Sequence, residues 1–296
     1  MQKRNVLNSK HLEELKRKKR KILRNKIIFF AIIFIIFLTG LVFLSRWENI
    51  NINTIRVLEN KIVETKDIVN VIHSKIDGHY LGLFPKTNFI LLPNKAIKNE
   101  LRSKFKRLKD IKIDTTDTNT LEITVSEYNG KYTWCGNDIP LDESPEENKC
   151  YFLDENGYVF DEAIYFSGNV YFKFFGKIKD NLENPIGSYY SPDTFQNIVS
   201  LIENLKQTGI KLSSLNLKED SDIEIYLKPI DSLNLPKIIL KSTFDFEKVV
   251  ENLQSVLTTE PFQSDFKNKY SSLLYIDLRF GNKVYYKFAE EIKNEQ

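Results

Sequence analysis

Hydrophobic positions along the chain fall into one unbroken run and many short periodic stretches. The run covers residues 27–44, eighteen residues without a charge or a proline. A helix of this length spans roughly 27 Å, close to the hydrocarbon core of a bilayer at about 30 Å. Lys26 and Arg46 bracket the run and can extend toward lipid headgroups, and Trp47 suits the far interface. The pattern predicts a transmembrane helix over residues 27–46.

Two alternatives fit this run less well. A cleaved signal peptide has an apolar region of about 7–15 residues and a small-residue cleavage site. The run is longer than that, and no A-x-A pattern follows it. A buried core helix normally shows a polar stripe, which this run lacks. The chain is therefore expected to consist of a tail over residues 1–26, the membrane helix, and about 250 further residues.

Flanking charge sets the expected orientation. Residues 1–26 contain eleven Lys or Arg and two Glu, a formal +9 in a chain of +3, which leaves −6 for the remainder. Lys and Arg beside a span stay in the cytoplasm. The N-terminus is therefore expected inside and the bulk of the chain outside. The basic run at 16–21 is attributed to topology and to anionic lipid, and no nucleic-acid partner is expected.

Short periodic stretches predict a small mixed unit over residues 50–127. A strand is expected near 55–57, followed by a helix over 65–78 and a second, basic helix that starts near Pro93. Alternating positions then predict two strands over 111–127, joined by a tight turn. The expected order is strand, helix, helix, strand, strand. The apolar face of the second helix is expected to comprise Ile97, Leu101, Phe105 and Leu108.

The pattern over residues 128–290 predicts a mostly antiparallel β domain with added helices, before a short tail over 291–296. An Asn-Gly turn within 154–157 is expected to join two strands, since both residues accept positive φ. A helix capped by residues 191–193 and a second helical stripe from Phe246 are also predicted. Further strands are expected over 170–175, 212–217, 223–227, 237–240, 274–279 and 284–288. The expected fold class of the whole chain is α+β.

The two cysteines, Cys135 and Cys150, flank a polar loop. On an oxidising side of a membrane they suit a disulfide, which would close a loop of about 15 residues and contribute roughly 3 kcal/mol. Two unpaired thiols are the alternative. All three histidines lie well upstream, so these cysteines cannot form a closed zinc site with them. No metal and no cofactor is expected.

The sequence holds no persuasive catalytic constellation. No histidine follows His79, so Ser-His and Cys-His machinery is missing from the second domain. His73, Asp77 and His79 are interpreted as solvated positions near a helix end. Ser264 and Lys267 satisfy S-x-x-K, a pattern short enough to occur by chance. There is no Walker loop and no G-x-G-x-x-G, and we expect a protein without enzymatic activity.

Several motifs follow the membrane helix in a recognisable order. Ile55-Arg56-Val57 opens the first unit and T-L-E-I-T-V-S-E closes it at 120–127. In the second unit, L-D-E-N-G-Y-V-F at 153–160 precedes Y-I-D-L-R-F at 275–280. Together they resemble the POTRA and β domains of the FtsQ/DivIB family of bacterial cell division proteins. The prolines usual in that family before the second strand and before Thr120 are missing here, and the insertion between the cysteines is not typical of it.

The resemblance implies a single-pass protein of the cytoplasmic membrane, located at the division septum. Its outer domains would bind other bitopic coiled-coil division proteins of the FtsB/DivIC and FtsL types and so help to control septal peptidoglycan synthesis. Binding would occur by strand addition to an exposed last strand. The partner-binding residues implied in this way are Arg279, Phe280, Tyr275, Val284 and Tyr286, and the strand over 284–288 is expected to take part as a whole.

The alternative function is a membrane-anchored envelope enzyme or sensor in which the POTRA unit is a spacer. A deep polar cleft would favour that alternative, whereas a flat sheet with an open edge favours the scaffold. For the scaffold, Arg279→Glu is expected to abolish pull-down of a coiled-coil partner and to leave thermal unfolding unchanged.

Overall fold

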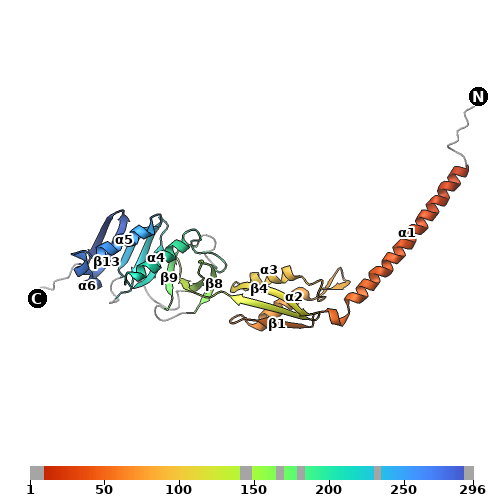
Figure 1. The fold of residues 1–296 in the computed structure, drawn as a ribbon, viewed down its shortest axis with the longest axis horizontal. Helices are drawn as coiled ribbons and strands as arrows, with labels where there is room; N and C mark the ends of the chain where they lie inside the picture. The colour runs from red at the N-terminus through yellow and green to blue at the C-terminus, as the bar shows by residue number, and fades with distance from the viewer. Residues whose placement is uncertain (1–9, 141–148, 165–169, 179–183, 230–234, 290–296) are drawn as a thin grey trace, which may run out of the picture. The chain divides into compact units, whose positions relative to one another are not determined.

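The computed structural model describes residues 10–140, 149–164, 170–178, 184–229 and 235–289. Contacts divide the chain into two compact units, Met1–Glu127 and Tyr128–Gln296. Each unit has a hydrophobic core of its own. The helices and strands are labelled in Figure 1, and their arrangement is α+β, as the sequence predicts.

The first helix, α1 (Lys10–Ser45), contains the apolar run and continues through basic residues that precede it. Between Glu13 and Ser45 it is long and apolar enough to cross a membrane, by length and composition. Thr39 Oγ1 donates to Ile36 O at 2.8 Å, so this hydroxyl is satisfied inside the helix. A 3₁₀ turn, η2 (Glu48–Ile50), follows and leads into the first sheet.

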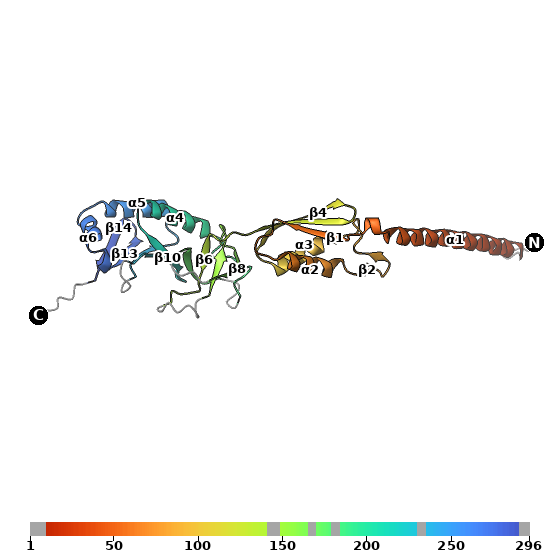
Figure 2. The ribbon, with the colours of Figure 1, turned by 90° about the horizontal axis from the view of Figure 1, so that it is seen from below.

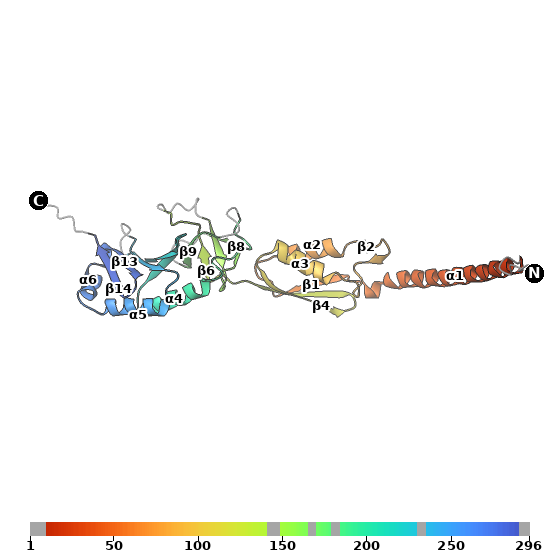
Figure 3. The ribbon, with the colours of Figure 1, turned by 90° about the horizontal axis from the view of Figure 1, so that it is seen from above.

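The rest of unit 1 is built on a three-stranded sheet with two helices on one face (Figures 2 and 3). The strands lie in the order β1-β5-β4, with β5 parallel to β1 and antiparallel to β4. The elements are β1 (Thr54–Leu58), α2 (Thr65–Ile76), α3 (Asn94–Lys104), β4 (Leu108–Asp117) and β5 (Thr120–Glu127).

The core of unit 1 follows from two periodicities in the sequence. Ile68, Ile72 and Ile76 recur at helical spacing on α2 and are at most 1% exposed, as are the alternating Leu121, Ile123 and Val125 of β5. The expectation for α3 was partly wrong. This helix ends at Lys104, so Phe105 is its C-cap and Leu108 begins β4, where it is buried.

A short hairpin between α2 and α3 is absent from the predicted elements. It consists of β2 (His79–Tyr80) and β3 (Phe84–Pro85), which pair antiparallel. Strands of two residues are too short to show an alternating pattern, so periodicity could not reveal them. The hairpin lies beside the C-terminal end of α1 (Figures 2 and 3).

Unit 2 is built on a nine-stranded sheet in the order β14-β13-β12-β11-β10-β9-β6-β7-β8. Most neighbours are antiparallel, as predicted, but the sheet is mixed: β9 is parallel to β6 and β10, and β12 is parallel to β13. The strands are β6 (Tyr132–Trp134), β7 (Cys150–Leu153), β8 (Val159–Ala163), β9 (Phe172–Gly176), β10 (Leu212–Leu217), β11 (Asp222–Leu227), β12 (Lys237–Lys241), β13 (Leu273–Phe280) and β14 (Lys283–Phe288).

Helices cover one face of this sheet, because a parallel connection needs a crossover. The helix α4 (Phe195–Gln207) connects β9 to β10, and α5 (Phe246–Leu257) lies between β12 and β13. Both lie on the same face in Figures 2 and 3. The short helix α6 (Phe262–Asn268) follows α5, and the 3₁₀ turn η3 (Tyr270–Ser272) leads into β13. Buried Ile198 and Leu253 belong to the same core as Ile225, Ile238 and Ile276 of the sheet.

Two local predictions in unit 2 need correction. The helix α4 does not use residues 191–193 as its cap: Thr194 is the N-cap and makes no side-chain capping bond. In the β7–β8 turn only Gly157 has positive φ, at 79°, while Asn156 does not. Asp154 holds the turn instead, because its Oδ1 accepts the N–H groups of Asn156 and Tyr158 at 2.8 Å each.

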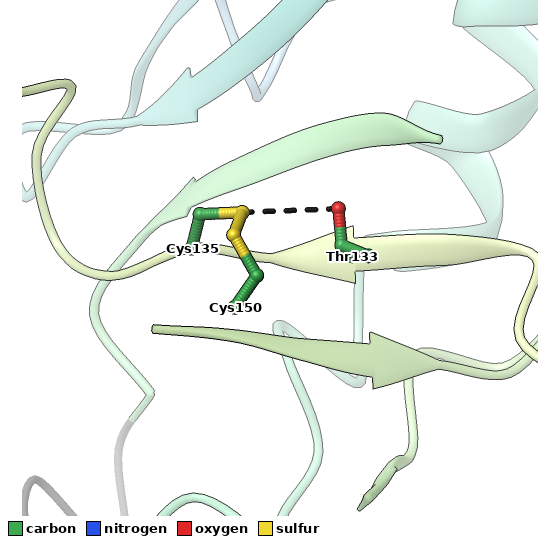
Figure 4. Close-up of a disulfide and its surroundings, with 3 residues drawn as sticks. All are labelled: Thr133, Cys135 and Cys150. Carbon is green, nitrogen blue, oxygen red and sulfur yellow. Dashed lines mark hydrogen bonds between the residues drawn. A yellow bond between two sulfur atoms is a disulfide. The ribbon is translucent and has the colours of Figure 1, made fainter. Parts of the chain in front are cut away.

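Cys135 and Cys150 form a disulfide between the end of β6 and the start of β7 (Figure 4). These strands are neighbours in the sheet, and the Cα atoms of the two cysteines lie 4.1 Å apart. Thr133 Oγ1 lies 3.8 Å from Cys135 Sγ. The bridge closes the long connection between two strands that the sheet already pairs, so it restricts the unfolded chain more than it shapes the folded one.

Replacement of both cysteines by serine should lower the free energy of unfolding of unit 2 by roughly 3 kcal/mol, the chain-entropy value for a loop of this length. Buried Trp134 reports on this unit, so urea unfolding of the full chain in nanodiscs can be followed by its fluorescence. A reductant should destabilise the wild-type protein and leave the double variant unchanged. Equal stability of the two oxidised proteins would show that the bridge contributes nothing.

Candidate partner-binding edge of the large sheet

The last strand, β14, lies at one end of the nine-stranded order and pairs with β13 alone. Among the described residues, no backbone group bonds to the outer edge of β14. This agrees with the prediction that the last strand lies at a sheet edge. An edge strand presents unpaired N–H and C=O groups, which another extended segment can pair with.

The pairing register identifies the outward backbone groups. Ala289 N–H donates inward to Ser272 O at 2.7 Å. In an antiparallel pair, successive residues direct both backbone groups alternately toward and away from the neighbour. The two register shifts in this pair add their extra residues to β13, so the alternation along β14 is uninterrupted. The N–H and C=O groups of Phe288, Tyr286 and Val284 therefore point away from β13.

Side chains of these same three residues pack on the helix-covered face. Val284, Tyr286 and Phe288 contact the core cluster of unit 2. The ring of Tyr286 lies 4.5 Å from that of Phe262 on α6, centroid to centroid. The side chains of Val284 and Tyr286, two of the implied binding residues, thus hold the strand against the core. Their backbone N–H and C=O groups remain open to a partner strand.

An exposed aromatic pair lies on β13 and β14. Phe280 is 56% exposed and Tyr285 is 49% exposed. Their ring centroids lie 5.1 Å apart in an edge-on arrangement, a geometry that aromatic rings prefer. Exposed Lys283 and Lys287 flank Tyr285 along the strand. Phe280 was an implied binding residue, and Tyr285 lies within the strand 284–288 that was also expected to take part.

Arg279 is fixed by ion pairs within the sheet. Its Nη1 lies 2.7 Å from Asp222 Oδ2, and its Nη2 lies 2.6 Å from Asp277 Oδ2. Lys241 pairs with the other oxygen of Asp222. Both carboxylates are only 8% exposed, and the Arg279 side chain is 32% exposed. The side chains meet because all four residues project from the face of the sheet opposite α4 and α5.

The ion pairs determine the titration of both carboxylates. Burial alone would raise the pKa of Asp222, but its bonds to Lys241 and Arg279 outweigh burial and leave the pKa below 3.8. Burial would also raise the pKa of Asp277, but its bonds to Arg279 outweigh burial and lower this pKa from 3.8. The pKa of Arg279 is raised by the same two partners. Because both pKa values are lower in the folded state than in the unfolded state, the two ionised carboxylates stabilise the folded state above pH 3.8. This stabilisation is lost as the pH falls through the lowered values.

Other implied and candidate residues are placed as follows. Tyr275 is half-buried and lies opposite Lys237 and Lys287 in the strand register. Ser264 Oγ donates to Glu260 Oε1 at 2.7 Å, so the serine of S-x-x-K is bonded to a carboxylate. Within the described parts of the chain, no three His, Cys, Asp or Glu side chains gather as metal ligands.

The membrane-flanking residues lie on or just after α1. Lys26 is exposed on the helix, and Trp47, at the N-cap of η2, is 62% exposed. Arg46 is exposed as well, and its Nη2 donates to Leu83 O of the β2–β3 hairpin at 3.4 Å. Both flanks of the apolar run are thus available to lipid headgroups.

Comparison of the sequence with protein-family models gives no match, and comparison with curated proteins gives no relative. The function is therefore inferred from the geometry of β14 and from the motifs in the sequence.

The expectation that Arg279→Glu leaves unfolding unchanged conflicts with the ion pairs of Arg279. This change places a third carboxylate beside two buried ones and should lower the free energy of unfolding at pH 7 by about 1–3 kcal/mol. Urea unfolding at pH 7 and below pH 3.8 would measure it, and the loss should shrink at the lower pH as Asp222 and Asp277 become protonated.

A matched charge reversal is Arg56→Glu, because Arg56 is exposed on β1 in unit 1. This control should leave the unfolding of unit 2 unchanged. If Arg279→Glu were as stable as the wild type at pH 7, the ion pairs would not contribute to folding, and Arg279 would be free for a partner.

Proposed function

We propose that this chain is a membrane-anchored, non-enzymatic scaffold for cell division of the FtsQ/DivIB type. It binds other bitopic division proteins, of the FtsB/DivIC and FtsL types, by adding a strand of the partner to β14. Through these partners it helps to control septal peptidoglycan synthesis. Its N-terminus lies in the cytoplasm, and α1 spans the cytoplasmic membrane. The part of unit 1 that follows α1 and all of unit 2 lie outside at the division septum.

The observation that carries this proposal is the unpaired outer edge of β14. A partner segment that pairs with Val284, Tyr286 and Phe288 would satisfy backbone groups that water satisfies in the lone chain. Because packing on α6 already holds β14 extended, only the partner has to lose conformational freedom. Such a strand gains affinity from backbone bonds and specificity from alternate side chains.

The surface beside the edge indicates the chemistry of the partner. On the helix-free face, Tyr285 and Phe280 present apolar rings, and Lys283 and Lys287 are exposed. A partner segment with an apolar residue against the rings and carboxylates against the two lysines would be complementary. Arg279 is a supporting residue in this account, since its guanidinium is bound to Asp222 and Asp277.

Three further features support a location outside the cytoplasm and a division role. The apolar helix α1 and the basic residues before it fit an anchor with its N-terminus inside. The Cys135–Cys150 bridge fits an oxidising compartment. The strand-helix-helix-strand-strand order of unit 1, interrupted only by the short hairpin, fits the POTRA resemblance.

Val284→Pro tests the backbone edge directly. Proline has no N–H, and the N–H of Val284 points away from β13, so the change removes an outward donor and spares the β13–β14 ladder. Pull-down of a co-expressed bitopic partner of the FtsB/DivIC type should weaken about tenfold, or about 1.4 kcal/mol. Undiminished binding by a Val284→Pro protein that retains the Trp134 signal of the folded unit would exclude strand addition at β14.

Side-chain recognition can be tested in the same assay with a matched pair of tyrosines. Tyr285 is 49% exposed with a ring neighbour at 5.1 Å, and Tyr189, near the opposite end of the sheet, is 48% exposed with a ring neighbour at 5.0 Å. Tyr285→Ala should cost more than about 1 kcal/mol of binding, whereas Tyr189→Ala should cost none. Equal effects would mean that the aromatic pair takes no part in recognition.

A further inference from the structure

The β2–β3 hairpin of unit 1 carries exposed leucines at its tip. Leu81 is 93% exposed and Leu83 is 47% exposed. They are separated by Gly82 alone, and Ile90, in the segment that follows β3, is 73% exposed. A single exposed apolar residue needs no explanation, but several on one small element are typical of a contact with a partner or with lipid.

The backbone conformation at the tip also disfavours leucine at position 81. Leu83 N–H donates to Tyr80 O at 3.0 Å, and the two central residues of the turn have positive φ, 51° at Leu81 and 71° at Gly82. Turns of this kind favour Asn or Gly, since at positive φ a Cβ atom lies too close to the following carbonyl oxygen; Gly has no Cβ, and the short Asn side chain can bond locally. Leu81 thus carries two penalties, backbone strain and the exposure of its side chain to water. An apolar environment around the side chain would remove the second penalty.

Hydrogen bonds fix the hairpin to the end of α1. Arg46 Nη2 donates to Leu83 O at 3.4 Å, and Asn88 Nδ2 donates to Ser45 O at 3.2 Å. Ile52 N–H donates to Thr87 O at 2.8 Å. These bonds join the hairpin and the segment after it to both sides of the η2 turn, and Figures 2 and 3 show β2 next to the end of α1.

This attachment sets the depth of the leucines. The apolar run of α1 ends at Leu44, and Arg46 and Trp47 follow after Ser45. Where α1 crosses a bilayer, these two residues lie at the level of the headgroups. Leu83, whose backbone oxygen accepts a bond from Arg46, lies at that same level. Lys86, whose Nζ lies 5.8 Å from the centre of the Tyr80 ring, adds a cation beside the tip.

We propose that the β2–β3 hairpin is a second membrane contact, with Leu81 and Leu83 inserted into the headgroup–acyl boundary of the bilayer that α1 spans. The occupant of this apolar tip is lipid, because the tip is bonded to the end of a helix that enters lipid. The inference rests on insertion of α1 and is independent of partner binding at β14. It gives unit 1 a fixed face toward the membrane, through burial of apolar surface beside cationic side chains.

Site-specific fluorescence can test this contact in the full chain. Because both native cysteines are in the disulfide, a cysteine introduced at one position can be labelled alone with an environment-sensitive fluorophore. Leu81→Cys and Leu83→Cys proteins are reconstituted into vesicles of phosphatidylethanolamine and phosphatidylglycerol. Their emission should shift to the blue and be quenched by lipids that carry a quencher near the headgroup.

Two control positions make the outcome decisive. Ile62→Cys is matched in chemistry, since Ile62 is apolar and 63% exposed. Ile62 lies in the loop that follows β1, where its N–H donates to Glu127 Oε1. This loop is about 16 Å, the length of β1, from the end of the strand that is nearest α1. A label at position 62 should therefore remain unquenched. Ile35→Cys, within the apolar run, should be reached by quenchers deep in the acyl region if α1 is inserted.

Labels at 81 and 83 that behave like the label at 62 while position 35 is in lipid would overturn the proposal and leave the anchor intact. If the label at position 35 were not quenched, α1 would not be inserted in the bilayer, and the proposal would fall with it. Leu81→Asn supplies a second test, since asparagine suits the turn and keeps the hairpin folded. With this change, the label at position 83 should lose much of its quenching, and full retention would show that Leu81 makes no contact with lipid.

Discussion

Buried backbone N–H and C=O groups need hydrogen-bond partners, and the outward groups of β14, one of the two end strands of the large sheet, find none within the sheet. Each inner strand of the sheet pairs on both sides, whereas β14 pairs only with β13. The side chains of Val284, Tyr286 and Phe288 hold the strand against the core of unit 2, and their backbones face outward. Since the cost of ordering β14 has already been met by folding, a partner segment meets a rigid edge. A rigid, unpaired edge is also prone to unwanted pairing, which exposed Lys283 and Lys287 oppose.

The neighbourhood of this edge separates residues that support it from residues that can recognise a partner. Arg279, with Asp222, Asp277 and Lys241, ties β13 to β11 and β12 across the helix-free face of the sheet. Its donors are engaged, and removing them would leave Asp277 buried without its counter-charge and Asp222 with Lys241 alone. Phe280 and Tyr285 have the opposite character, since about half of each residue remains open to solvent. A defect caused by a change at Arg279 would therefore combine lost folding with lost binding, whereas a change at Tyr285 affects mainly the surface.

Local pattern predicted much of the fold, and pairing across the sheet accounts for what it missed. Alternation identified most of the long strands, such as β5 and β11, and helical spacing identified α2, α4 and α5. The parallel partners of β9 and β12 depend on which strands meet after a crossover, which no local pattern states. The β2–β3 hairpin is too short to show a period. Within the last strand Val284 and Tyr286 were singled out, whereas the exposed ring is that of Tyr285, because Tyr286 packs on the core of unit 2. The partners of Arg279 were hidden as well, since Asp222 is 57 residues away in sequence.

Hydrogen exchange along β14 in the membrane-embedded full chain tests the central claim most directly, before and after saturation with a bitopic partner of the FtsB/DivIC type. Alone, the amides of Val284, Tyr286 and Phe288 should exchange faster than those of Tyr285 and Lys287, which face β13. With the partner bound, the three fast amides should become protected while the other two change little. Outward amides that are already protected in the lone chain, or that stay unprotected at saturation, would contradict the account.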